Sequence, residues 1–154
     1  ATISGGMKAL LEHPDQLEKL RKNPALAKQA AREMIRWVSP VRHMMRTTTQ
    51  DVVLHGRTIK AGQSLCLWYP SANRDSDAID NPDTFDIERD NRNQLAFGFG
   101  GHMCLGQHLA VLEVELFFQA LLPRLKHIEL AADPEWVQAI FVGGLKSMPV
   151  RYAF

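Results

Sequence analysis

The sequence has no long apolar run, no excess of either charge and almost no cysteine. Eighteen basic and 17 acidic residues leave a net charge of +1, so there is no electrostatic case for nucleic acid or an anionic membrane as a partner. No apolar stretch reaches the roughly 20 residues that span a bilayer, and no signal peptide opens the chain. Two cysteines cannot build a disulfide framework, so a reducing cytoplasm is the expected location.

The first residues lack both an initiator Met and a helix cap. Ile3, Met7, Leu10 and Leu11 already follow a helical spacing. We interpret this as a helix cut in two, and therefore as part of a longer chain. With 154 residues and 45% apolar residues, the sequence is expected to form a partial single domain over 1–154.

Hydrophobic periodicity and breaker residues predict four helices. They are expected over residues 1–12, 15–22, 23–38 and 105–121. Asn23-Pro24 offers an N-cap followed by proline for the third helix, and Ser39-Pro40 ends it. The last helix carries an apolar stripe made of Leu105, Leu109, Leu112 and Leu116.

Short β-branched segments between turn glycines predict small strands. A small antiparallel sheet is expected within 44–70, and further strands over 126–130, 136–142 and 148–152 with a turn at Gly143-Gly144. Residues 71–96 are rich in Asn, Asp and Pro and are expected to form a long loop with one helical turn near 72–76. The predicted fold class is mainly α with small antiparallel β-sheets.

Two features outside residues 97–106 have ordinary interpretations. Glu33 and Arg36 in EMIR lie three apart on one helical face, which most often means a surface ion pair. Cys66 lies between leucines in SLCLWYP, which favours a small buried hydrophobe.

The stretch FGFGGHMCLG at 97–106 carries the chemistry of the sequence. His102 and Cys104 could ligate zinc, but structural zinc takes four ligands and no second pair stands at finger spacing. A dinucleotide loop needs a third glycine where Met103 stands. A nucleophilic cysteine needs a base, and no histidine is obviously set to activate Cys104.

A permanently bound thiolate fits the pattern better. Cys104 precedes the N-terminus of the 105–121 helix, where the dipole and the free N–H groups lower the pKa of a thiol. Glycines allow backbone to approach a flat cofactor and to donate hydrogen bonds to sulfur. The phenylalanines would exclude water. These properties describe a thiolate bound to haem iron.

The loop resembles the haem-binding signature of the cytochrome P450 superfamily: Phe, two residues, Gly, any residue, His or Arg, any residue, Cys, any residue, Gly. Its fixed positions are filled by Phe97, Gly100, His102, Cys104 and Gly106. Glu33 and Arg36 match the E-x-x-R of the family, and Arg89 in FDIERD matches the meander arginine that completes a structural triad. The segments YPSANRD, HMCLGQHLA and FVGG-x-K-x-x-P resemble soluble bacterial members that oxidise terpenoids, notably the α-terpineol-oxidising group.

The resemblance implies a role for each matching residue. Cys104 is the axial ligand of the iron of haem b, iron protoporphyrin IX, and His102 and Arg46 approach the haem propionates. The implied cofactor-binding set is Cys104, His102, Arg46, Phe97, Gly98, Gly100 and Gly106. The implied substrate-pocket candidates are Val41, Met44, Met45, Phe141 and Val142.

The resemblance further implies a haem-thiolate monooxygenase that hydroxylates a small apolar substrate, such as a terpenoid, with O2. Electrons would come from a [2Fe–2S] ferredoxin and its NAD(P)H-dependent reductase. The oxygen-activating acid–alcohol pair of the family precedes the position of Ala1, so no catalytic residue beyond the iron ligand is expected here. The isolated chain is then expected to be inactive. Two rivals are a non-catalytic haem-binding or structural fragment and a zinc-binding module.

Overall fold

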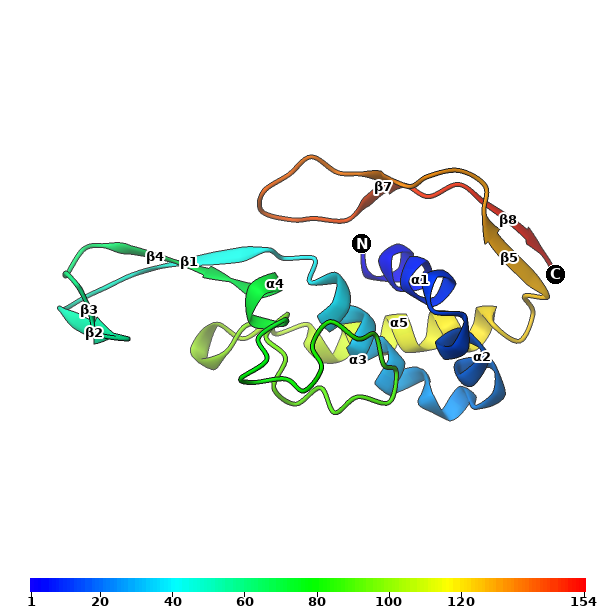
Figure 1. Cartoon of the computed structure of the whole chain (residues 1–154), viewed down its shortest axis with the longest axis horizontal. Coiled ribbons are helices and arrows are strands. Elements are labelled where there is room, and N and C mark those ends of the chain that lie inside the picture. Colours follow the sequence, from blue (N-terminus) through cyan, green and yellow to red (C-terminus); the bar gives the residue numbers. More distant parts are fainter.

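The computed structural model describes all residues 1–154, and a body of helices carries long two-stranded ribbons (Figure 1). The helices are α1 (Thr2–Glu12), α2 (Pro14–Lys22), α3 (Ala27–Val38), α4 (Tyr69–Ala72) and α5 (Gln107–Leu121), with 3-10 turns η1 (Pro24–Leu26) and η2 (Gly100–His102). The strands are β1 (His43–Thr47), β2 (Val52–Leu54), β3 (Arg57–Ile59), β4 (Ser64–Trp68), β5 (His127–Leu130), β6 (Glu135–Trp136), β7 (Leu145–Ser147) and β8 (Val150–Ala153).

The hydrophobic core lies where α1, α3 and α5 pack on one another. Gly5 and Gly6 let α1 approach α3 closely: a Cβ on Gly6 would stand 2.6 Å from Met34 Sδ, and one on Gly5 would stand 2.7 Å from Val38 Cγ2. Larger residues at these glycines would force the two helices apart. The close packing of α1 on α3 therefore depends on the absence of a side chain at Gly5 and at Gly6.

The three N-terminal helices lie where their breaker residues predict them, with one correction. Asn23 does not cap α3 with its side chain, because the 3-10 turn η1 intervenes and the α-helix begins only at Ala27. Asn23 stands at the N-cap of that turn, but its side chain accepts no hydrogen bond there. At the other end, Ser39 adopts a left-handed conformation with φ 42° and Pro40 follows, which ends α3 as expected.

The predicted apolar stripe of α5 is exposed, and a different face of this helix enters the core. Leu105 precedes the helix, which begins at Gln107, and the other three leucines of the stripe are also exposed. The buried residues of α5 are Val111, Val114 and Phe118. The helix is apolar around most of its circumference, so its sequence pattern could not select the inner face.

The strands form four separate two-stranded antiparallel sheets, and two of these lie where one small sheet is expected within 44–70. β1 pairs with β4, and the β2–β3 hairpin lies at the far end of this ribbon (Figure 1). Cys66 of β4 pairs with Met45 of β1 and is exposed, so the buried interpretation of this cysteine is wrong. Because no further layer packs over this two-stranded ribbon, side chains such as Cys66 stay exposed to solvent.

Two boundaries in the remaining chain also differ from the predictions. The helical turn expected near 72–76 begins earlier, at Tyr69, because Pro70 suits the first turn of a helix. Of the strand expected over 136–142, only Trp136 belongs to a strand, and the segment continues as a loop to Gly143-Gly144. None of the helices has the length and apolar character that crossing a membrane requires.

Candidate haem-binding site

Glu33, Arg36 and Arg89 meet in the interior, although they lie far apart in the sequence. Arg36 donates from Nε and Nη2 to the two carboxylate oxygens of Glu33, both at 2.7 Å. Arg89 Nε reaches Glu33 Oε1 at 3.3 Å. The Glu33 and Arg36 side chains are 0% exposed, so the surface ion pair expected from EMIR is in fact fully buried. Such a pair holds its position through further hydrogen bonds rather than through charge alone.

The remaining donors of the two arginines hold the long polar loop against α3. Arg36 Nη1 donates to the main-chain carbonyls of Asn73 and Pro82, each at 2.8 Å. Arg89 Nη2 donates to the carbonyls of Asn81 at 2.9 Å and Thr84 at 2.8 Å. One charged cluster therefore fixes several turns of a segment that has almost no regular secondary structure.

The loop at 97–106 has a defined backbone conformation. Gly98 and Gly100 have φ of 75° and 70°, in the left-handed region that glycine adopts without strain. The amide of Gly98 donates to the carbonyl of Leu95, and the amide of Cys104 donates to the carbonyl of Phe97, both at 2.8 Å. These bonds close the loop on itself and present Cys104 two residues before the Gly106 N-cap of α5.

Cys104 and His102 line a cleft of about 510 Å³ between the loop, the N-terminal part of α1 and the first half of α5. Eleven of its 15 lining residues are apolar, including Phe97, Val41 and Met44. Cys104 is a free, exposed thiol on the wall of this cleft. The cleft therefore combines mainly apolar walls with a sulfur atom, which suits an apolar cofactor that carries a metal.

The other predicted site residues do not line the cleft. Arg46 of β1 is half-buried, and its Nη1 donates to the carbonyl of Met45 at 2.9 Å. Met45 is exposed, and so in part is Met44, although Met44 lines the cleft. Val142 forms a bridge to Val41, which brings the loop before Gly143 next to the 40–44 segment.

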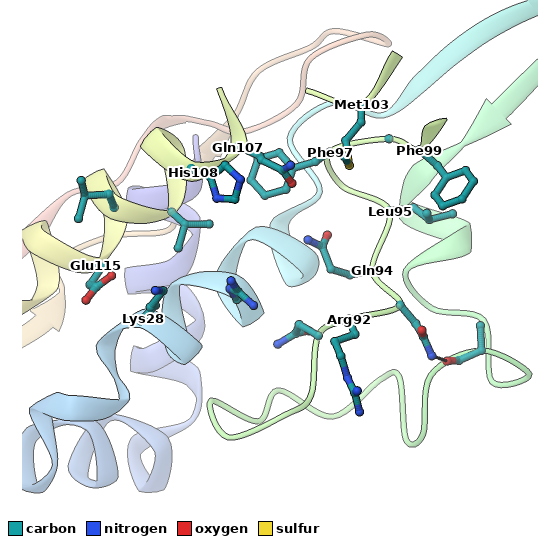
Figure 2. A pocket seen from close by; sticks show the side chains of 17 residues that line it. Lys28, Arg92, Gln94, Leu95, Phe97, Phe99, Met103, Gln107, His108 and Glu115 are labelled. Atoms are coloured by element: carbon teal, nitrogen blue, oxygen red, sulfur yellow. Dashed lines mark hydrogen bonds between the residues drawn. The ribbon is translucent and has the colours of Figure 1, made fainter. Parts of the chain in front are cut away.

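A second cavity, of about 790 Å³, opens on the other side of Phe97, which also lines the cleft (Figure 2). Lys28 and Arg32 come from α3, His108 and Glu115 from α5, and Arg92 from the polar loop. Arg92 bonds Asp90 and lowers the pKa of that carboxyl group, whereas Lys28 and Arg32 form no ion pair. Glu115 is the only acidic residue of the lining, so the cavity carries a basic surface.

The sequence model of the cytochrome P450 family matches residues 2–137 of this chain. The chain belongs to the cytochrome P450 family. Cytochrome P450-terp of a Pseudomonas species is 47% identical over 99% of this chain and 36% of its own length. A steroid C26-monooxygenase of Mycobacterium tuberculosis is 43% identical over 98% of this chain and 41% of its own length. The chain thus spans about two fifths of the curated relatives that it matches.

The fold of this P450 chain is also that of solved members. The crystal structure of CYP108D1 from Novosphingobium aromaticivorans superposes with a TM-score of 0.94 at 41% identity, covering 99% of this chain and 37% of the other. The predicted fold class, mainly α with small antiparallel sheets, is thereby confirmed. The match includes the exposed ribbons, so their extended shape is a property of the P450 fold.

The residues present fit a haem of the P450 kind. A free thiol lies on an apolar wall that His102 also lines. Glycine at position 98 lets the loop pack closely against Tyr69 of the same wall, because a Cβ on Gly98 would stand 3.1 Å from Tyr69 Oη. Sequence reasoning missed Tyr69, Ile35 and Ala110, which complete the wall of the cleft. No local pattern distinguishes these three residues from ordinary core residues, so only their position in space identifies them.

Two polar residues that sequence reasoning did not single out connect α3 to the long loop. Arg74 lies over the Trp37 ring with its guanidinium carbon 4.2 Å from the ring centroid, and its Nη2 donates to the Trp37 carbonyl at 3.2 Å. Burial, together with the charge of Arg36, lowers the pKa of Arg74. Asn73 is fully buried beside Arg36. Both residues lie in the segment YPSANRD, whose resemblance to the family assigns neither of them a role.

Proposed function

We propose that this chain is the haem-binding, C-terminal portion of a P450 monooxygenase. The observation that carries the proposal is the free Cys104 thiol on the wall of an apolar cleft, with His102 beside it. Membership of the P450 family makes this thiol the candidate ligand of a haem iron. A thiolate-ligated haem supplies electron density that favours O–O cleavage.

Each residue of the site would hold one part of the cofactor. Cys104 would ligate the iron as a thiolate, because the helix that begins after Gly106 favours negative charge at its N-terminus. His102 and Arg46 would bind the propionate carboxylates, Arg46 after swinging away from the Met45 carbonyl. Phe97 and the loop glycines would keep water away from sulfur and allow backbone to approach the ring.

The substrate would be a small apolar molecule, such as a terpenoid. Val41 and Met44 offer an apolar surface inside the cleft, and the loop at Phe141 and Val142 lies against the same segment. Apolar walls of this kind select by shape and size. The names of the relatives, P450-terp and steroid C26-monooxygenase, make a steroid the main alternative substrate.

Catalysis is tested by product formation with the full-length polypeptide that carries this chain. The purified, haem-loaded protein is supplied with a [2Fe–2S] ferredoxin, its NAD(P)H-dependent reductase and O2, with a terpenoid or a steroid as substrate. Hydroxylated terpenoid, formed at a rate coupled to NAD(P)H use, is the expected result. Haem binding with no product from either substrate would instead support the non-catalytic alternative.

The electron donor would approach the basic cavity on the far side of Phe97 (Figure 2). Lys28 and Arg32 are exposed and unpaired, so they can attract an acidic protein such as a ferredoxin. This route leads to the cysteine loop rather than to the substrate side of the cleft. The cytoplasm, where free thiols such as Cys66 and Cys104 persist, would be the location.

Reversing the charges of Lys28 and Arg32 to glutamate is expected to slow electron transfer from the ferredoxin on the order of tenfold at low salt, because steering of an acidic partner is lost. Stopped-flow reduction of the haem, measured against ionic strength, checks the prediction. The difference should shrink at high salt. Arg124→Glu, an exposed position beyond the C-terminal end of α5, is the control for a single charge reversal away from the cavity and should behave like the unmodified protein. Equal rates for the double variant and the control would contradict the docking site.

A further inference from the structure

Asn73 is fully buried just after α4, and its side chain bonds two separate segments. Asn73 Nδ2 donates to Ser39 Oγ at 2.8 Å, and the amide of Leu95 donates to Asn73 Oδ1 at 2.7 Å. Ser39 Oγ in turn donates to the carbonyl of Arg36 at 2.7 Å. One amide group thus connects the C-terminus of α3 with the chain that leads into the cysteine loop.

The bond to Leu95 continues into the loop itself. The Leu95 carbonyl accepts from the amide of Gly98, and the Phe97 carbonyl accepts from the amide of Cys104, each at 2.8 Å. A shift at Leu95 would therefore move the turn that holds Phe97, and with it the partner of the Cys104 amide. Successive hydrogen bonds join the buried Glu33–Arg36 cluster to Cys104 through Asn73.

The side chain of Asn73 is shielded from water. Its main-chain carbonyl already accepts from Arg36 Nη1 at 2.8 Å, and its side chain is 0% exposed. Buried amide groups that lose a partner are costly because water cannot replace the bond. Loss of either contact of this side chain would therefore leave a buried donor or acceptor without a partner.

We propose that Asn73 is a positioning residue for the cysteine loop: its side chain clips the start of the loop to the C-terminal end of α3 and so fixes the backbone that presents Cys104. This deepens the proposed function, and it rests on that function only where Cys104 is taken as the iron ligand. The clip itself is a property of the chain without cofactor.

Amide hydrogen exchange of the 154-residue chain, followed by mass spectrometry, tests the clip directly. Asn73→Ala removes both side-chain bonds, so peptides that cover 95–104 are expected to exchange about tenfold faster. Peptides from α1 and α2 should change less than about twofold. Unchanged exchange at 95–104, or equal acceleration in every peptide, would overturn the proposal in favour of no role or of general destabilisation.

Two matched variants separate the clip from a generic effect of losing an asparagine. Asn93→Ala removes an exposed amide whose Nδ2 bonds the Ala78 carbonyl at 3.1 Å, and it should leave exchange at the Cys104 amide unchanged. Asn73→Asp keeps an acceptor for the Leu95 amide but loses the Nδ2 donor to Ser39, so it should restore only part of the protection. An aspartate variant as unprotected as Asn73→Ala would count against the Leu95 bond.

Ser39→Ala decides the question if Asn73→Ala does not fold. This variant removes the anchor on α3 while Asn73 stays in place, and exchange at 95–104 should rise several-fold. No rise would overturn the link to α3. In the haem-loaded protein, Asn73→Ala should also yield a mixture of thiolate and non-thiolate bands in the reduced, CO-bound spectrum. A parent chain that shows no thiolate band would contradict the proposed function and leave the exchange result standing.

Discussion

Replacing Glu33 with glutamine is expected to lower the free energy of unfolding by about 3–5 kcal/mol, a third or more of the stability of an ordinary domain. The glutamine amide can accept on only one side, so it leaves the buried Arg36 guanidinium without its counter-charge. The Glu33 carboxylate also accepts from the amide of Asp86 at 3.0 Å. Urea unfolding followed by circular dichroism measures the loss.

The control for this substitution is Glu129→Gln on β5. Glu129 pairs with Arg151 at 3.6 Å, and both side chains are more than half exposed. An exposed pair contributes little, so this variant should lose less than about 1 kcal/mol. If Glu33→Gln were as stable as Glu129→Gln, the buried cluster would not be the element that holds the polar loop to α3.

Replacing Cys104 with alanine is expected to abolish the thiolate-type Soret band of the reduced, CO-bound protein completely. The substitution removes the sulfur from the cleft while leaving the apolar walls that would hold the ring. The variant should therefore still take up haem, with a spectrum typical of a neutral or missing axial ligand. Haem content and the CO difference spectrum of the same sample separate loss of ligation from loss of binding.

Cys66→Ala is the matched control, because it removes the other free thiol of the chain. Cys66 lies on β4, opposite Met45, and does not line the cleft. Its variant should keep the thiolate band at full amplitude. A band that survives in Cys104→Ala, or disappears in Cys66→Ala, would show that the wrong cysteine has been assigned.

Local breakers in the sequence predicted most of the helical framework. Pro14 separates α1 from α2, and Ser39-Pro40 ends α3, because proline and the residue before it cannot continue a helix. These effects act within a few residues. They can therefore be predicted from the sequence without knowledge of the tertiary structure.

Features that depend on neighbours distant in the sequence could not be predicted in this way. The core face of α5 contains Val111 rather than the leucine stripe, because α3 and α1 decide which side of an apolar helix is covered. Cys66 is exposed because its ribbon has only two strands. Asn73 has no local signal at all, since its partners Ser39 and Leu95 lie 34 and 22 residues away.

Part of the candidate site could likewise be predicted from a local sequence pattern, and part could not. The spacing of His102 and Cys104 in a glycine-rich loop is a local pattern and points to metal chemistry from sequence alone. The apolar cleft in front of Cys104 is built from α1, α3, α5 and the 40–44 segment, and no stretch of sequence contains it. The sequence thus predicts the ligand, whereas the structure supplies the enclosure that makes haem its fitting partner.

X-ray absorption at the iron edge of the haem-loaded chain tests the central claim most directly, because it reports the atoms bound to iron without relying on a spectral fingerprint. We expect one sulfur neighbour in the first shell, present in Cys66→Ala and absent in Cys104→Ala. A first shell of nitrogen and oxygen alone in the unmodified chain would contradict the assignment of Cys104 as the iron ligand.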